Sequence, residues 1–166
     1  MITQDELKEL LSYCPDTGIF TWIKRNGNIA GCVKPDGYVC IKVSGRLYLA
    51  HRIAWLYMHG SFPEDMIDHI NGSKGDNRIE NLRQATRSQN LANQKINSVN
   101  TSGLKGVSWR KDRNKWHTQI RVSGKLKHLG YYIDKHEAHV AYCKAADKYH
   151  GEFANYGWFD TNLMRA

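Results

Sequence analysis

Residues 66–97 decide the fold, and they read MIDHINGSKGDNRIENLRQATRSQNLANQKIN. The apolar segment 66–70 predicts a short strand, and the polar segment 71–77 predicts a loop. Residues 81–85 predict a second short strand or an extended turn. The capping-box residues that follow open a helix over 86–97. The stretch therefore predicts a strand–loop–strand–helix unit.

Three side chains in this unit suit the hydrolysis of a phosphodiester. Asp68 and His69 lie on the first predicted strand, and Asn90 lies in the first turn of the predicted helix. A strand–loop–helix unit folds these positions towards one another. Carboxylate and amide oxygens are hard ligands that suit Mg²⁺, and an imidazole can act as a base near neutral pH. The unit therefore predicts a metal-assisted hydrolytic site.

The spacing of these residues carries the interpretation, because each residue alone has a simpler explanation. An isolated Asp-His pair is most often part of a surface turn. Asn77 is explained equally well by a left-handed turn and by a role in tying the loop. For His51 a structural role and a functional role are equally good explanations.

The sequence before this unit predicts a short helix and a small antiparallel sheet. Thr3 and Glu6 form a capping box at the start of the helix. Strands are predicted at residues 18–22, 37–43 and 47–49. Residues 51–59 predict a second helix. Gly60 and Pro63 are expected to end it.

The last third of the chain predicts three strands and a helix. The polar segment 98–104 predicts a linker. The strands are predicted at residues 105–110, 115–122 and 125–132, and Asp134 caps the helix. On the central strand, Trp116, Thr118, Ile120 and Val122 alternate with Lys115, His117, Gln119 and Arg121. The first set is expected to pack on the helix and the second to face outwards.

The charge of the chain indicates an anionic partner. The formal net charge is +8, and residues 101–166 hold 12 Lys/Arg against 6 Asp/Glu. A basic surface of this kind is typical of proteins that bind nucleic acid or anionic surfaces. No apolar run approaches the roughly 20 residues that span a bilayer, so a membrane partner is not expected. The start of the chain has no apolar signal segment, so we expect the cytoplasm.

The motifs around the predicted site resemble those of HNH endonucleases. They read HRIAW at 51–55, IDHING at 67–72, NRIENLR at 77–83 and SQN at 88–90. The resemblance covers about residues 38–97 and is to the phage homing branch, in which Asn replaces the last His. It implies that His69 is the general base and that Asp68 and Asn90 bind one Mg²⁺ or Mn²⁺. It also implies that Asn81 ties the loop through backbone hydrogen bonds.

His51 and Arg52 match positions that recur in the same family, but the resemblance does not define their role. Contact with the scissile phosphate and a scaffold role are both compatible with it. Some HNH relatives bind a structural zinc through cysteine pairs. The four cysteines of this chain form no C-x-x-C pair, so no structural zinc is expected.

Residues 103–155 resemble an AP2 DNA-binding domain. The matching motifs are KGVSWR at 105–110, KWHTQIR at 115–121, HLGYY at 128–132, EA at 137–138 and AY at 141–142. The resemblance implies a sheet that lies in the major groove of DNA and is backed by one helix. Positions that match its DNA contacts are Lys105, Ser108, Arg110, Lys115, Gln119, Arg121 and His128. Arg113 and His117 are further expected DNA contacts. Ser108 and His128 differ from the residues common in that family, so the base sequence is not predicted.

Together these observations predict an α+β protein of two modules. Residues 1–97 form a ββα-metal nuclease with its core at about 66–97, residues 98–104 the linker, and residues 105–157 the AP2-like domain. The predicted function is a site-specific DNA endonuclease of homing type, in a phage-infected or bacterial cytosol. One active site per chain is compatible with nicking of one strand, and a double-strand break by a dimer is left open. Its partner is double-stranded DNA, bound as a monomer, with a dimer left open. The alternatives are a DNA-binding regulator with an inert HNH-like scaffold and, third, a protein that binds or cuts RNA.

Overall fold

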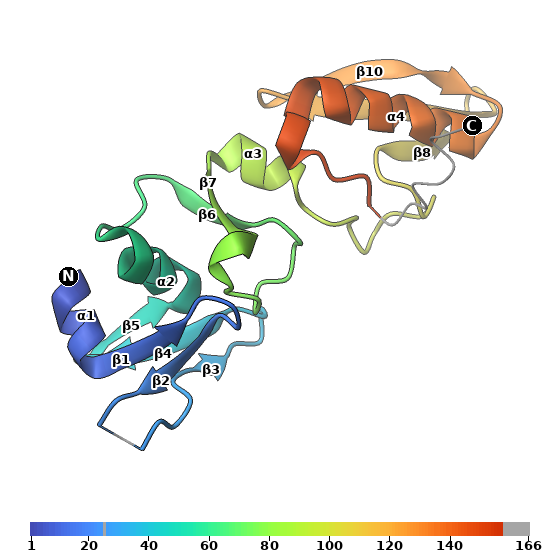
Figure 1. Cartoon of the computed structure of the whole chain (residues 1–166). Helices are drawn as coiled ribbons and strands as arrows, with labels where there is room; N and C mark the ends of the chain where they lie inside the picture. The colour runs from blue at the N-terminus through green and yellow to red at the C-terminus, as the bar shows by residue number, and fades with distance from the viewer. Residues whose placement is uncertain (25, 158–166) are drawn as a thin grey trace. The chain divides into compact units, whose positions relative to one another are not determined.

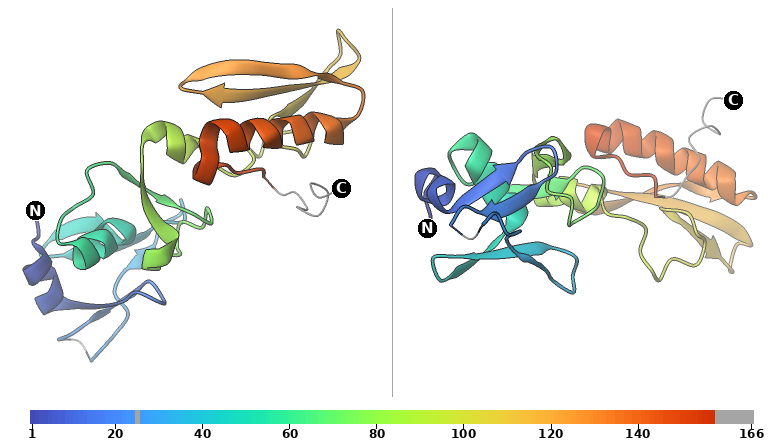
Figure 2. Two further views of the ribbon diagram at one scale, coloured as in Figure 1. Left: turned by 45° about the horizontal axis from the view of Figure 1, so that its top comes forward. Right: turned by 60° about the horizontal axis from the view of Figure 1, so that its bottom comes forward.

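The computed structural model describes residues 1–24 and 26–157. The chain has a mixed α/β fold and divides into two compact units, Met1–Thr86 and Arg87–Ala166. Figure 1 labels the elements and Figure 2 gives two further views. Within the described residues, no helix combines the length and the apolar character needed to cross a bilayer.

The first unit begins with a helix and a hairpin. Helix α1 (Gln4–Leu10) has the predicted capping box: the Glu6 amide donates to Thr3 Oγ1, and the Thr3 amide donates to Glu6 Oε2. Strands β1 (Leu11–Cys14) and β2 (Ile19–Trp22) pair antiparallel. The sequence interpretation missed β1, because its first residue, Leu11, continues the apolar stripe of the helix.

A three-stranded antiparallel sheet and a helix complete the framework of this unit. The sheet has the order β3 (Cys32–Val33), β4 (Val39–Val43), β5 (Arg46–Leu49). Helix α2 (Ala50–His59) contacts β4 and β5. The largest buried apolar side chains of the unit are those of Leu7, Leu11, Phe20, Ile41 and Ile53. The core therefore joins α1, both sheets and α2.

The predicted strand–loop–strand–helix unit is present. Strands β6 (Met66–His69) and β7 (Leu82–Ala85) pair antiparallel, with a 3-10 turn, η1 (Ile79–Asn81), before β7. Helix α3 (Arg87–Ala92) follows and belongs to the second unit.

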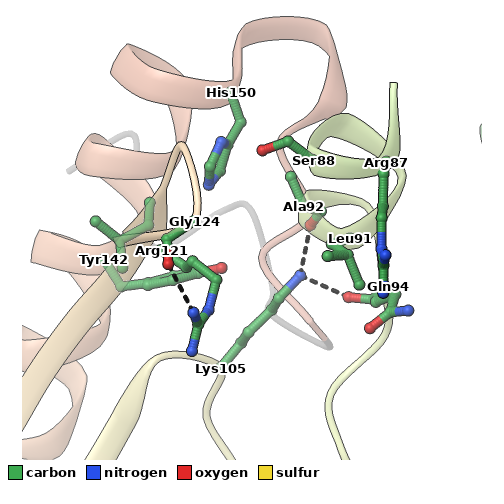
Figure 3. Close-up of a pocket in the computed structure, with 11 residues that line it drawn as sticks. Arg87, Ser88, Leu91, Ala92, Gln94, Lys105, Arg121, Gly124, Tyr142 and His150 are labelled. Atoms are coloured by element: carbon green, nitrogen blue, oxygen red, sulfur yellow. Dashed lines mark hydrogen bonds between the residues drawn. The ribbon is translucent and has the colours of Figure 1, made fainter. Parts of the chain in front are cut away.

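Helix α3 is shorter than predicted, because it ends at Ala92 and not near Asn97. The physical reason lies in Lys105, whose Nζ donates to the carbonyl oxygens of Ala92 and Gln94 (Figure 3). The last carbonyl groups of a helix need partners outside the helix, and this ammonium group supplies one for Ala92, the last helical residue.

The second unit contains the predicted three-stranded sheet and its helix. Strands β8 (Val107–Arg110), β9 (Lys115–Val122) and β10 (Lys125–Tyr132) are antiparallel in the order β10-β9-β8. Helix α4 (Lys135–His150) lies along one face of the sheet (Figures 1 and 2) and ends in a 3-10 turn, η2 (Gly151–Phe153).

Side chains of β9 alternate as predicted. Thr118 and Ile120 are buried towards α4, whereas Lys115 and Arg121 are exposed. The sequence interpretation missed a polar contact in this core. His139 and Cys143 of α4 are buried, and His139 Nε2 lies 3.5 Å from Cys143 Sγ.

The predicted linker, residues 98–104, lies inside the second unit. Leu104 is buried in the core, and Ser102 Oγ donates to the Val107 carbonyl over 2.8 Å. The segment therefore packs on the sheet beside it.

Candidate active site

The β6–β7 hairpin holds Asp68 and His69 in the interior of the first unit. Their exposed fractions are 4% and 5%. Asp68 lies opposite Arg83 in the strand register, and Arg83 Nε and Nη2 both lie 2.9 Å from Asp68 Oδ2. A buried carboxylate needs such a charged partner. The hairpin thus presents an acid and an imidazole from consecutive positions.

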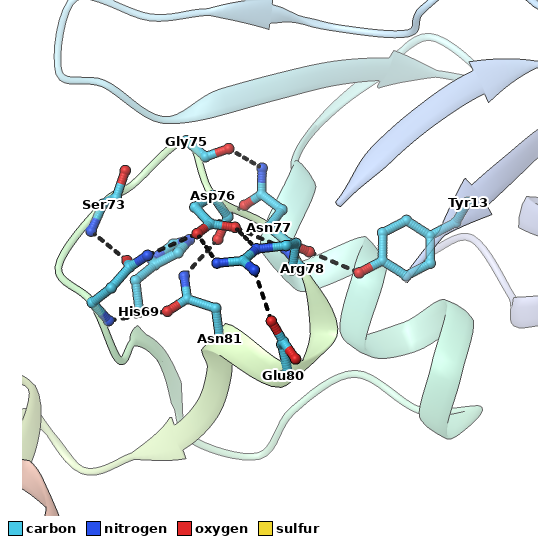
Figure 4. Close-up of polar contacts among 10 residues, drawn as sticks. Tyr13, His69, Ser73, Gly75, Asp76, Asn77, Arg78, Glu80 and Asn81 are labelled. Carbon is cyan, nitrogen blue, oxygen red and sulfur yellow. Dashed lines mark hydrogen bonds and ion pairs between the residues drawn. The ribbon is translucent and has the colours of Figure 1, made fainter. Parts of the chain in front are cut away.

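Asn77 contacts the imidazole of His69 (Figure 4). Its Oδ1 lies 3.2 Å from His69 Nε2, and its Nδ2 donates to the Gly75 carbonyl over 3.2 Å. The second bond fixes the amide so that the oxygen faces the imidazole. An amide oxygen only accepts, so His69 Nε2 carries the hydrogen and Nδ1 is the basic nitrogen.

The environment favours the neutral form of His69. Burial lowers the pKa of His69, while the bond to Asn77 and the charge of Asp68 oppose this effect. A histidine with a lowered pKa is unprotonated at neutral pH. Its Nδ1 can therefore accept a proton.

Asn81 ties the loop between β6 and η1, as predicted. Its Oδ1 accepts from the Asn71 amide over 3.0 Å, and its Nδ2 donates to the Asp76 carbonyl over 2.8 Å. The Asp76 carboxylate in turn forms a two-bond pair with the Arg78 guanidinium, at 2.9 and 2.8 Å. This guanidinium holds the pKa of Asp76 well below its usual range. Hydrogen bonds and an ion pair therefore hold the loop together at several points (Figure 4).

The loop also rests on the β1–β2 hairpin. The Tyr13 hydroxyl donates to the Asn77 carbonyl over 2.7 Å, and this contact is buried. Gly18 lies so close to the loop that a Cβ there would be 2.4 Å from the backbone nitrogen of Arg78. Asn77, which contacts His69, is therefore held in place by both Tyr13 and Gly18 of this hairpin.

His51 lies on α2 next to the catalytic candidate. Its ring centroid is 5.1 Å from that of His69 and 5.3 Å from that of Tyr38. Among the described residues, His51 Nδ1 has no hydrogen-bond partner. Burial first, and then the charges of His69 and Arg52, lower the pKa of His51 to about 3. A neutral imidazole therefore packs against His69. The neighbouring Arg52 donates through Nη2 to the Pro63 carbonyl over 3.4 Å.

Asn90, the second predicted metal ligand, lies half-buried on α3 in the other unit. Its approach to Asp68 and His69 stays a prediction. No group of three or more His, Cys, Asp or Glu side chains that could hold a metal occurs in residues 1–24 and 26–157. A carboxylate and an amide are nevertheless the hard oxygen donors that Mg²⁺ or Mn²⁺ prefers, so the chemistry of the predicted ligands fits such an ion.

The outer face of the β8–β10 sheet carries most of the predicted DNA contacts. Lys115 is exposed on it, and His117 and Gln119 are half-buried. Arg121, a predicted DNA contact at the end of the same strand, is exposed but lines a pocket beside Tyr142 and His150 of α4 (Figure 3). His117 Nε2 lies 2.9 Å from Nδ1 of His128, with 10° between the ring planes. The face thus presents Lys115 together with an imidazole pair.

Other predicted contacts lie at the edge of this face. Ser108 is exposed on β8. Arg110 pairs with Asp112 over 3.0 Å, and Arg113 lies 3.8 Å from the same carboxylate. All of these side chains are accessible to a partner.

Lys105, a predicted DNA contact, is bonded within the protein instead. Its Nζ donates to the carbonyl of Ala92 over 2.9 Å, and burial lowers the pKa of Lys105 to about 8. This lysine therefore faces α3 and not the outer face of the sheet.

Two neighbours of Asp68 and His69 were missed from the sequence. Arg83 could have been found from the hairpin register, because a two-strand pairing that places Met66 opposite Ala85 also places Asp68 opposite Arg83. Tyr38, whose ring centroid is 6.1 Å from that of His69, comes from a distant strand and left no local signal.

Comparisons with known proteins show which proteins this chain resembles. A family model described as HNH endonuclease matches residues 48–92. Protein 3.8 of Escherichia phage T7 is 35% identical over 107 residues, which cover 64% of this chain and 88% of that protein. The uncharacterized HNH endonuclease L560 of Acanthamoeba polyphaga mimivirus is 30% identical over 120 residues, which cover 72% of this chain and 62% of that protein.

A solved structure described as DNA binding and cleavage by the HNH homing endonuclease I-HmuI also aligns with this chain. It covers 85% of each chain, with 20% identity and a TM-score of 0.43. The hairpin with its Asp-His pair and the sequence matches above define the class as an HNH-type nuclease scaffold. The chain belongs to the HNH endonuclease family.

Proposed function

We propose that this chain is a metal-dependent, site-specific DNA endonuclease of the homing type that cuts one strand at each visit. The observation that carries the proposal is the buried contact of His69 Nε2 with Asn77, which leaves Nδ1 as the basic nitrogen. In the proposed reaction Nδ1 takes a proton from water, and the water oxygen attacks phosphorus in line as the 3′ oxygen leaves. Asp68 and Asn90 would hold the divalent ion, which stabilises charge on the scissile phosphate and the leaving oxygen when bound.

The second unit supplies affinity in this proposal. Residues 101–166 carry 12 of the 24 Lys/Arg of the chain with only 6 Asp/Glu, and Lys115 is exposed on the outer sheet face. Cations on a rigid sheet bind phosphates and can reach base edges. We also propose that this face binds the major groove of double-stranded DNA, as the resemblance to AP2 domains implies.

The first prediction concerns His69. We expect wild-type protein to nick supercoiled plasmid with Mg²⁺ or Mn²⁺ and to stop when EDTA is added. His69→Ala should slow nicking about 10²–10⁴-fold, because the general base is lost. Conversion of supercoiled to open-circular plasmid on a gel measures both effects.

The matched control is His59→Ala, because His59 is an exposed histidine at the end of α2. It should nick at the wild-type rate. Duplex binding without cleavage by any variant would instead identify a DNA-binding regulator with an inert scaffold. Preference for structured RNA over duplex in a competition assay would identify an RNA-binding protein.

A further inference from the structure

A cavity of about 630 Å³ lies inside the second unit (Figure 3). We name it the α3–α4 cavity. Its lining includes Arg87 and Leu91 of α3, Lys105, Arg121 of β9, and Tyr142 and His150 of α4. Sites for small molecules measure roughly 300–1,000 Å³. The α3–α4 cavity therefore has the size of a small-molecule site.

Cations line this cavity without a balancing acid. Arg87, Lys105 and Arg121 contribute positive side chains, and no Asp or Glu of the described chain is among the lining residues. Burial lowers the pKa of His150, and the charge of Lys105 lowers it further. Both effects show that positive charge is unfavourable there, and a bound anion would relieve the repulsion. The electrostatics of the cavity therefore suit an anion.

The cationic groups have hydrogen-bond donors left for a ligand. Arg121 Nη1 donates to the Gly124 carbonyl over 2.8 Å, and Lys105 Nζ donates to two carbonyls of the α3 end. A guanidinium has five N–H donors and an ammonium has three. These internal bonds also hold the two side chains in place, which lowers the entropy lost on binding.

The remaining lining combines apolar side chains with the polar Ser88, Gln94 and His150. Ala92, Ile120 and Tyr142 are buried, and Leu91 is 47% exposed at the cavity. A simple anion such as phosphate would leave this surface in contact with water. A ligand that joins a flat, largely apolar ring to a phosphate would use both parts of the lining.

We infer that the α3–α4 cavity binds a nucleotide, with its phosphate at Arg87, Lys105 and Arg121 and its base against Leu91 and Tyr142. The nucleotide can be a free one or one unit of a DNA strand, since both have the same chemistry. The second source rests on the proposed function, because it requires that the chain binds DNA.

The test uses the full chain labelled with ¹⁵N and titrated with deoxyadenosine monophosphate. We expect saturable shifts of amide signals around Leu91, Arg121 and Tyr142. Deoxyadenosine and inorganic phosphate, each of which has half of the ligand, should bind at least about tenfold more weakly, because a lost charge-assisted bond or a lost stacking contact costs about that much. Equal binding of either half would overturn the inference.

Arg121→Gln should weaken deoxyadenosine monophosphate about tenfold or more. Lys144→Gln is the matched control, because it removes the same charge from an exposed α4 position outside the lining. It should change the affinity less than twofold. Leu91→Glu, which adds a carboxylate at an exposed lining position, should also weaken binding about tenfold. Equal affinity of Arg121→Gln and Lys144→Gln would refute the site.

An excess of short duplex then separates the two sources. Displacement of the mononucleotide assigns the cavity to a strand nucleotide, and its retention assigns the cavity to a free nucleotide. The plasmid-nicking assay keeps the two proposals apart. Absence of nicking with intact mononucleotide binding removes the proposed function alone, whereas nicking without mononucleotide binding removes the nucleotide site alone.

Discussion

A single amide selects the nitrogen of His69 that can accept a proton. Asn77 Nδ2 is committed to the Gly75 carbonyl, so its oxygen faces His69 Nε2. The imidazole is then held in one tautomer and one orientation. A general base depends on both, because its lone pair has to reach the proton that it removes.

We predict that Asn77→Ala slows nicking about 10–100-fold. The change leaves the Nε2 hydrogen of His69 and a loop carbonyl without their partner, which costs about 1–3 kcal/mol, and it frees the ring to turn. Single-turnover nicking at saturating DNA measures the effect. Asn28→Ala, at an exposed loop position, is the control. A wild-type rate for Asn77→Ala would show that the amide does not position the base.

We predict that acid destabilises the first unit through His51. The pKa of His51 is about 3 in the folded chain and near 6.5 in an unfolded one. The folded state therefore favours neutral His51, and its stabilisation is complete above pH 6.5 and declines as the pH falls towards 3. The maximum slope is about 1.4 kcal/mol per pH unit. His69, whose pKa is also lowered, adds a loss of the same sign.

Urea unfolding at pH 7 and pH 5, followed by amide signals of α2, measures this loss. His51→Gln should lose less stability between the two pH values than the wild type. His136→Gln, which removes an exposed histidine of α4, should leave the difference unchanged. Identical losses in wild type and His51→Gln would contradict the prediction.

Local sequence could predict Asp68 and His69 because they adjoin on one strand, and Asn81 because its spacing matched a known motif. It left Asn77 undecided between a turn and a loop tie, and the bond to His69 Nε2 now favours a side-chain role. For His51 the contact with His69 depends on the packing of α2. Such contacts between distant segments have no periodic pattern to reveal them.

At the level of elements, β8 begins at Val107 because Gly106 turns the chain beneath α4. Gly106 has a φ of 76°, and a Cβ there would be 2.1 Å from the ring of Tyr142. The strand therefore starts two residues later than the sequence predicted. The approach of backbone to ring also fixes the distance between sheet and helix.

We predict that Gly106→Ala destabilises the second unit by roughly 3 kcal/mol, since left-handed backbone strain and overpacking both oppose it. Gly124→Ala is the matched control. Its φ is 79°, but nothing lies within 4 Å of the added Cβ, so roughly 1 kcal/mol of backbone strain is expected. Urea unfolding followed by amide signals of α4 compares them. Equal losses would contradict the predicted clash.

Regular elements were predictable where the apolar pattern was regular. Strands β9 and β10 and helix α4 have long periodic runs and a clear cap at Asp134, and they lie where the sequence placed them. Strand β3 has only two residues, Cys32 and Val33, both exposed, so it has no alternation to detect. The end of α3 depends on Lys105, which is distant in sequence.

For the whole molecule, the net charge of +8 predicts DNA affinity that falls steeply with salt. Each phosphate contact contributes about 0.9 to the slope of log affinity against log salt. We predict that Lys115→Gln lowers the magnitude of this slope by about 0.9. Fluorescence anisotropy with a labelled duplex at several salt concentrations measures it. Lys144→Gln should keep the wild-type slope, and an unchanged slope for Lys115→Gln would exclude this side chain as a phosphate contact.

The contact between Tyr13 and Asn77 sets a limit on how short a fragment could keep the loop around His69 intact. The recognisable motifs begin near residue 38, so a designed fragment could start there. That fragment would lack the hydroxyl on the Asn77 carbonyl and the hairpin turn at Gly18 that lies against Arg78. The Asn77 side chain would then keep its bond to the Gly75 carbonyl, but its backbone would lose the support of the hairpin. The β1–β2 hairpin is therefore part of the smallest fragment that would keep both contacts of this loop, although it contains none of the motif residues.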